Sequence, residues 1–268
     1  MNIIERNFYR LLRAGAFNVE EQIEPLSAWK WNRLYQLSEM HGVSYIIYKG
    51  ITVCRHQFFV QIPERLLEQW AKAVSHDEGE DNTMIMADHL TNPILNRLLQ
   101  NILDSEDSDT ETRTALLHLT GIARFIMNAG IPVKRLVELA VFLHQHGKKV
   151  NYIQLESWIK QLKLGPMAQI TAVMLVQMMH LRPENVPFMK PVTEEKMNRQ
   201  IRDILRQKNS HAEEWYFSQD KSIFVHTSNA SAMLWHVRRS AKYFSYYPME
   251  MVPNFFASFA HSLSHIEE

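Results

Sequence analysis

Apolar residues recur three and four positions apart along most of the chain, which is the spacing of one face of an α-helix. The first such stretch ends near Gly15, which we expect to close that helix. A second stretch covers Leu26–Met40, and Gly42 follows it as the predicted C-terminal stop. Residues 45–62 have strand-like composition but no decisive period, so a helix and a short strand both stay open there.

Later helix boundaries are marked by capping patterns. Ser108 with Glu111 has the capping-box pattern, in which each side chain accepts a backbone N–H at a helix start. Asn151 with Gln154 repeats it, and an apolar helix is expected over 165–179. The sequence therefore predicts an all-α fold, a compact multi-helix assembly of about eleven helices with at most a few short strands.

Composition supports many helices and few tight turns. Only 8 of the 268 residues are glycine, about 3% against a usual ~7%. Cys54 is the single cysteine, which excludes an intrachain disulfide framework and fits a reducing compartment. The N-terminus becomes charged at Glu5 and Arg6, and the most apolar run, 170–181, is shorter than the ~20 residues of a membrane span. We therefore expect a soluble, cytoplasmic protein without a membrane partner.

Charge is balanced over the whole chain but not locally. Lys+Arg and Asp+Glu each number 29, so net charge gives no argument for a nucleic-acid partner. Residues 77–111 contain ten acidic residues and one basic residue, which is typical of solvated connectors. This predicts an N-terminal helical region (1–76), an acidic connector with a central helix (77–111) and a C-terminal helical region (112–268). The alternative is one composite domain over 1–268.

Residues that could carry chemistry are few. Cys54 has Arg55 and His56 beside it, which could lower its pKa, but an apolar stretch favours a buried, inert thiol. His261 and His265 could share a helix face, yet no third ligand is identified, so no metal site is predicted. Phosphate-binding glycine patterns are absent from the sequence.

A basic and aromatic stretch near the C-terminus is the candidate ligand or partner surface. On the helix expected over 231–243, its cations would share one side with aromatic rings, an arrangement that can hold phosphate or an acidic partner. The simpler alternative is a helix with aromatics in the core and cations at a solvated rim. A last helix is expected over 252–264. The candidate surface consists of Trp235, Arg238, Arg239, Lys242 and Tyr243.

Two blocks of helical sequence and a C-terminal piece carry a family likeness. The first block covers residues 8–74, with Phe8–Leu12, Trp31–Val43 and Ile62–Leu66; the second covers 116–188 around Gly130–Leu143, and the tail piece covers 224–240. In these segments the chain resembles the bacterial family of uncharacterised nucleotidyltransferases, a branch of the polymerase-β-like superfamily. The resemblance covers helical flanking regions.

The resemblance implies a catalytic core between the two blocks, a small mixed sheet with a Gly-Ser or Gly-Gly turn and an Asp-x-Asp pair that holds magnesium. The corresponding interval, 77–111, has no Gly-Ser pair and is too short for a sheet domain. Asp107 and Asp109 match Asp-x-Asp in letters, but connector acids ahead of a helix explain them better, and Glu138 stands where family members tend to have Asp. No catalytic residue or cofactor is therefore predicted.

The sequence favours a non-catalytic relative of nucleotidyltransferases that acts as a scaffold or interaction protein with a macromolecular partner. One alternative is a diverged or partner-completed nucleotidyltransferase, and magnesium belongs to this alternative alone. A second is nucleic-acid or phosphate binding through the C-terminal basic-aromatic helix, which the sequence does not favour. Stabilisation by magnesium with nucleoside triphosphates would indicate the enzyme.

Overall fold

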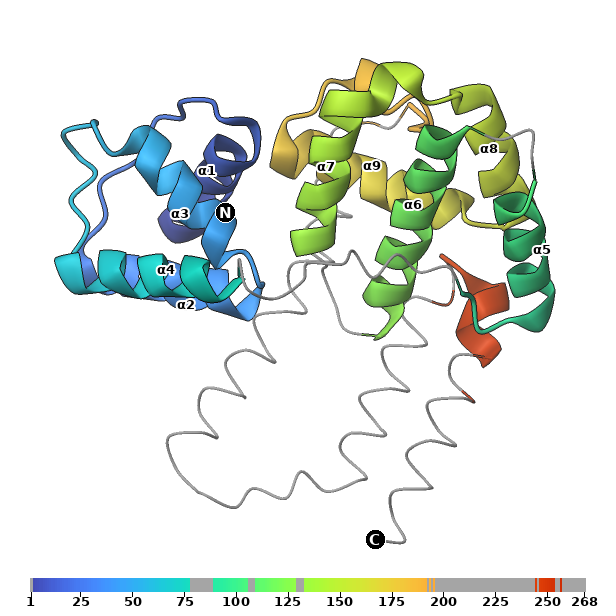
Figure 1. Cartoon of the computed structure of the whole chain (residues 1–268), viewed down its shortest axis with the longest axis horizontal. Helices are drawn as coiled ribbons and strands as arrows, with labels where there is room; N and C mark the ends of the chain where they lie inside the picture. The colour runs from blue at the N-terminus through green and yellow to red at the C-terminus, as the bar shows by residue number, and fades with distance from the viewer. Residues whose placement is uncertain are drawn as a thin grey trace, which may run out of the picture. The chain divides into compact units, whose positions relative to one another are not determined.

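The chain is all-α, as its periodicity predicts (Figure 1). The computed structural model describes residues 2–77, 89–105, 109–128, 133–191, 193, 195, 244, 246–253 and 256. Within these ranges no residue lies in a strand. The helices are α1 (Ile3–Phe17), α2 (Ala28–Met40), α3 (Ser44–Cys54), α4 (Glu64–Asp77), α5 (Pro93–Leu103), α6 (Thr110–Asn128), α7 (Val133–His146), α8 (Tyr152–Gln161) and α9 (Gly165–Met179), with the 3₁₀ turns η1 (Gly147–Lys149) and η2 (Pro183–Asn185).

The chain divides into two compact units. The first unit consists of Met1–Ile85, Pro132–Gln145 and Met174–Asn185, and the second of Met86–Ile131, His146–Val173 and Val186–Glu268. Most of α7 and the end of α9 therefore belong with α1–α4. The organisation into three regions, 1–76, 77–111 and 112–268, which was inferred from local charge, remains a prediction.

Helix α1 starts where the sequence supplies a cap and continues beyond Gly15. Asn2 Oδ1 accepts the backbone N–H of Glu5 (2.9 Å), and Glu5 Oε2 accepts the N–H of Asn2 (3.0 Å). The helix ends at Phe17, and Asn18 adopts the left-handed conformation with φ 54°. The prediction that Gly15 closes the helix is wrong, because Gly15 lies inside it.

Gly15 serves the packing of α1 against α3 instead. A Cβ atom placed on Gly15 would lie 1.9 Å from the Ile46 carbonyl oxygen, and one on Gly50 would lie 2.0 Å from the Leu11 carbonyl oxygen. The two helices therefore meet backbone to backbone at these glycines. This contact also explains why residues 44–54 are a helix despite their strand-like composition, because tertiary packing overrides propensity.

A buried polar cluster ties α2, α3 and α4 together. Ser38 Oγ accepts the indole N–H of Trp70 (3.1 Å) and donates to the Tyr35 carbonyl (2.7 Å). Ser44 lies beside Ser38 with their hydroxyl oxygens 3.0 Å apart. Ser38 and Trp70 are fully buried, so these bonds satisfy polar groups that water cannot reach. Gly42, with φ 61°, follows α2, which confirms the predicted stop.

In the second unit, a series of hydrogen bonds connects the start of α6 to the start of α8. Asp109 accepts both the backbone N–H (2.6 Å) and the hydroxyl (2.8 Å) of Thr112. The Thr112 hydroxyl oxygen accepts the N–H of Asn151 (2.8 Å), and Asn151 Oδ1 accepts the N–H of Gln154 (3.1 Å). The cap predicted at Asn151 is confirmed. Asp109 caps α6, and Ser108, the residue expected there, lies outside the described residues.

Candidate functional site

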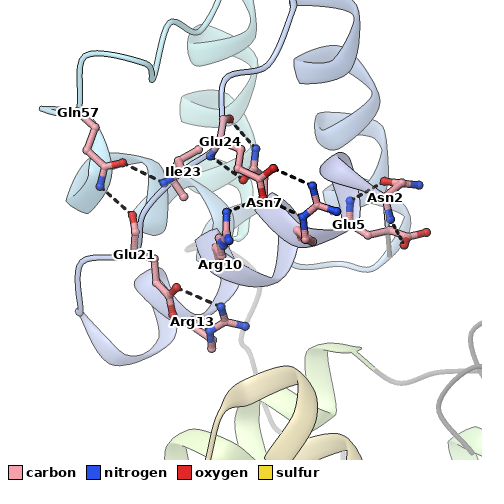
Figure 2. Close-up of polar contacts among 10 residues, drawn as sticks. Asn2, Glu5, Asn7, Arg10, Arg13, Glu21, Ile23, Glu24 and Gln57 are labelled. Atoms are coloured by element: carbon pink, nitrogen blue, oxygen red, sulfur yellow. Dashed lines mark hydrogen bonds and ion pairs between the residues drawn. The ribbon is translucent and has the colours of Figure 1, made fainter. Parts of the chain in front are cut away.

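Three arginines of α1 hold the connector between α1 and α2. Arg13 makes two bonds to the Glu21 carboxylate (2.6 and 3.1 Å), as drawn in part in Figure 2. Arg6 makes two bonds to Glu24 (2.8 and 2.7 Å), and Arg10 a third (2.7 Å). Bidentate arginine–carboxylate pairs fix geometry as well as charge. The connector is therefore held firmly along α1.

Asn7 and Arg13 add contacts that do not depend on ion pairing. The buried amide of Asn7 donates to the Glu24 carbonyl (2.8 Å) and accepts the Glu24 N–H (3.0 Å), as a strand neighbour would (Figure 2). Arg13 also donates to the Met178 carbonyl in the last turn of α9 (3.0 Å). Hydrogen bonds from Arg6, aided by the positive charges of Arg6 and Arg10, lower the pKa of Glu24 to about 2.

A glutamine attaches the α3–α4 loop, residues 55–63, to this connector. Gln57 Oε1 accepts the Ile23 N–H (3.0 Å), and Gln57 Nε2 donates to the Glu21 carbonyl (2.8 Å), as Figure 2 shows. The same amide donates to Glu20 Oε1 (3.1 Å), which also lies 2.9 Å from His56 Nε2. The loop is thus fixed through its side chains to a connector that is itself fixed to α1.

The two residues that follow Gln57 are exposed phenylalanines. Phe58 is 80% exposed and Phe59 is 58% exposed, and their rings stand edge to face with centroids 5.3 Å apart. A single exposed apolar side chain is ordinary, but two adjacent aromatic rings on a firmly held loop form a small apolar surface. We call Phe58 and Phe59 the aromatic tip. Arg55, His56 and Gln57 directly precede it in the chain, and Glu20 contacts His56 and Gln57.

The surface predicted from sequence cannot be compared with this tip. Its five residues all lie outside the described ranges, as do Asp107 and the pair His261 and His265. The members are Trp235, Arg238, Arg239, Lys242 and Tyr243. The aromatic tip was not predicted, because residues 58–60 read from sequence as a buried strand-like run. The signal available was that Phe58 and Phe59 are consecutive, so a strand would have placed one ring on each face.

The structure also shows the surroundings of three other residues considered in the sequence analysis, Cys54, Asp109 and Glu138. Cys54 is buried, and its burial raises the pKa of the thiol, which disfavours the reactive thiolate. Both carboxylate oxygens of Asp109 accept bonds from Thr112. Glu138 is half-buried on α7, and burial raises its pKa against the opposing effect of Lys134 and Arg135.

Among the residues that the structure describes, no three His, Cys, Asp or Glu side chains gather in a group that could hold a metal ion. Within the same part of the chain, no helix combines the length and the apolar character needed to cross a bilayer. No family model matches the chain, and no curated protein and no solved structure matches it either.

Proposed function

We propose that this chain is a non-catalytic interaction protein that binds a protein partner through the aromatic tip. The exposed, firmly held pair Phe58 and Phe59 is the observation that carries the proposal. The proposal includes the resemblance of the helical segments to nucleotidyltransferases. A relative of these enzymes that lacks the catalytic core would keep a helical scaffold, and that scaffold could bind a partner without catalysing a reaction.

The way the loop is held supports a binding role. An aromatic side chain that becomes fully buried contributes on the order of 150–250 Å². Phe58 still exposes 80% and Phe59 58% of its area, so most of that burial is left for a partner to provide. Because Gln57 already fixes the loop to the connector, little conformational freedom would be lost when the rings enter a partner's pocket. Binding energy in protein interfaces concentrates in a few such aromatic residues.

The surroundings of the tip favour a protein over a lipid surface. Polar residues directly precede the rings in the chain, and Glu20 contacts two of them, His56 and Gln57. Apolar residues bordered by polar ones are the usual anatomy of a protein interface. Attraction to anionic lipid needs clustered positive charge. Here Arg55 is a single cation close to the tip in the chain, and the carboxylate of Glu20, 2.9 Å from His56 Nε2, works against such attraction.

The test begins with a photo-crosslinking phenylalanine analogue in place of Phe58 in cells, followed by purification of the crosslinked partner. Binding of the purified partner is then measured by calorimetry for the parent and for Phe58→Ala/Phe59→Ala. We expect affinity to fall about 30-fold or more, as for an interface hot spot of about 2 kcal/mol. Gln57→Ala, which keeps both rings but frees the loop, should produce a smaller loss.

Ile153→Ala is the matched control, because Ile153 is 87% exposed and lies on α8 of the other unit. It should bind as the parent does. Unchanged affinity of the double variant would contradict the proposal, and so would binding to neutral vesicles that disappears with the two rings. Stabilisation of the parent by magnesium with nucleoside triphosphates would instead favour the transferase alternative.

A further inference from the structure

The α3–α4 loop begins with two consecutive tight turns of the backbone. In the first turn the Gln57 N–H donates to the Cys54 carbonyl (3.1 Å), and Arg55 and His56 are the central residues. In the second turn the Val60 N–H donates to the Gln57 carbonyl (2.9 Å), with the aromatic tip at its centre. A hydrogen bond between residues three apart is typical of a β-turn. The backbone therefore fixes where the side chains of both central pairs begin.

Arg55 in the first turn is exposed, and within the described ranges no acidic side chain forms an ion pair with it. Glu20, which contacts this loop, binds the two residues after Arg55 instead. Its Oε1 atom lies 2.9 Å from His56 Nε2 and accepts a hydrogen bond from Gln57 Nε2 (3.1 Å). A guanidinium carries five N–H donors in a planar fork and stays charged at physiological pH. Arg55 can therefore bind a carboxylate that another molecule supplies.

Arg55 is close enough to the aromatic tip to be covered by the same partner. It lies three positions before Phe58, so the Cα atoms of these residues are at most about 11 Å apart. A standard protein interface covers about 800 Å² on each partner, equivalent to a disc of about 16 Å radius. An interface centred on the aromatic tip therefore reaches Arg55. A cation in this area needs a group of opposite charge on the partner, because burying an unpaired charge is costly.

We infer that the partner protein presents an aspartate or glutamate beside the apolar pocket that receives the aromatic tip, and that Arg55 binds this carboxylate. The inference rests on the proposed function, because it names the chemistry of the same partner. Arginine and aromatic residues carry much of the binding energy in protein interfaces. A guanidinium binds a carboxylate through two parallel hydrogen bonds, which fixes orientation as well as charge. The two rings would thus supply apolar burial, and Arg55 would select acidic partners.

The test uses a random-peptide library displayed on phage, selected in parallel on the parent chain and on Phe58→Ala/Phe59→Ala. Peptides enriched on the parent alone require the aromatic tip, and we expect them to combine large apolar residues with an excess of Asp or Glu. Selection on Arg55→Glu should replace this excess with Lys or Arg, because the charge at the site is reversed. Lys148→Glu is the matched control. It reverses one exposed charge in the second unit and should select the same acidic peptides as the parent.

Calorimetry with a synthetic copy of the most enriched peptide then measures the pair in a double-mutant cycle. Replacing the acid of the peptide by its amide should weaken binding to the parent about tenfold and leave binding to Arg55→Gln nearly unchanged. An equal loss with both proteins overturns the inference, as do tip-dependent peptides without an acidic excess. In both cases the aromatic tip remains the binding site. If no enriched peptide depends on the two rings, the inference and the proposed function fail together.

Discussion

Each of the two units uses one glutamate to hold a segment against its helices, but the two glutamates are placed differently. Glu24 in the first unit accepts bonds from Arg6 and Arg10 and stays partly exposed. Glu250 in the second unit is fully buried, and its described bonds come from backbone N–H groups. A partly exposed ion pair contributes little net stability, whereas a buried carboxylate is costly to disturb. The second unit should therefore be more sensitive at this glutamate.

For glycine substitutions, the first unit is expected to be the more sensitive of the two. Gly50 in the first unit has no room for a Cβ atom, because the Leu11 carbonyl oxygen would be 2.0 Å away. Gly165 in the second unit starts α9, and a Cβ atom there would meet no atom within 4 Å. For these two pairs of residues the sensitive position therefore differs: a glycine at a backbone contact in the first unit and a buried carboxylate in the second.

The largest effect is expected for Gly50→Ala. The neighbouring group is backbone and cannot rotate away, so α1 and α3 must separate, and the free energy of unfolding should fall by about 3 kcal/mol or more. Urea denaturation measures this value. Gly165→Ala is the control and should raise stability by about 0.4–1 kcal/mol, since alanine restricts the unfolded chain. A Gly50→Ala protein as stable as the parent would show that α1 and α3 do not meet in this way.

The next largest effect is expected for Glu250→Gln. The amide cannot accept the backbone N–H groups of both Thr91 and Asn92 as the carboxylate does, so about 1.5–3 kcal/mol of stability should be lost. Hydrogen exchange of the Thr91 and Asn92 amides should speed up at the same time. Glu24→Gln should lower stability less in the same denaturation experiment. The comparison of the two glutamates fails if Glu24→Gln proves the more destabilising change.

The smallest effect is the acid sensitivity of Glu24. Its pKa is lowered from 4.5 to about 2 in the folded chain, mainly by hydrogen bonds from Arg6. Its stabilising contribution is therefore complete above about pH 4.5 and disappears as the pH falls toward 2. The difference in Tm between the parent and Glu24→Gln should shrink over this interval. A difference that stays constant between pH 5 and about 2 would contradict the assigned ion pair.

Two predictions that depended on local sequence were confirmed. Gly42 ends α2 in a left-handed conformation, and Asn151 caps α8, because both features are determined by residues within one helical turn. The all-α fold follows from periodicity in the same way. Gly15 was misinterpreted because the same residue type serves two purposes, ending a helix or allowing two helices to touch, and the second depends on Gly50, which is 35 positions away.

The candidate site was less accessible to sequence reasoning. Phe58 and Phe59 lie in the stretch 45–62, which the sequence left open between a helix and a short strand, so their exposure could not be predicted. Their exposure depends on Gln57 binding the connector at Ile23 and Glu21, contacts that span more than thirty positions. The basic-aromatic surface at 235–243 stays a prediction.

The sequence by itself determined where most helices begin and end, because caps, glycines and periodicity act over a few residues. The tertiary structure decided which groups are buried and which are exposed, including the contact of Gly15 with α3, the aromatic tip and the burial of Glu250. The physical reason is that burial depends on what packs against a residue from distant parts of the chain. A carboxylate such as Glu250 becomes a buried helix cap only once the start of α5 lies beside it.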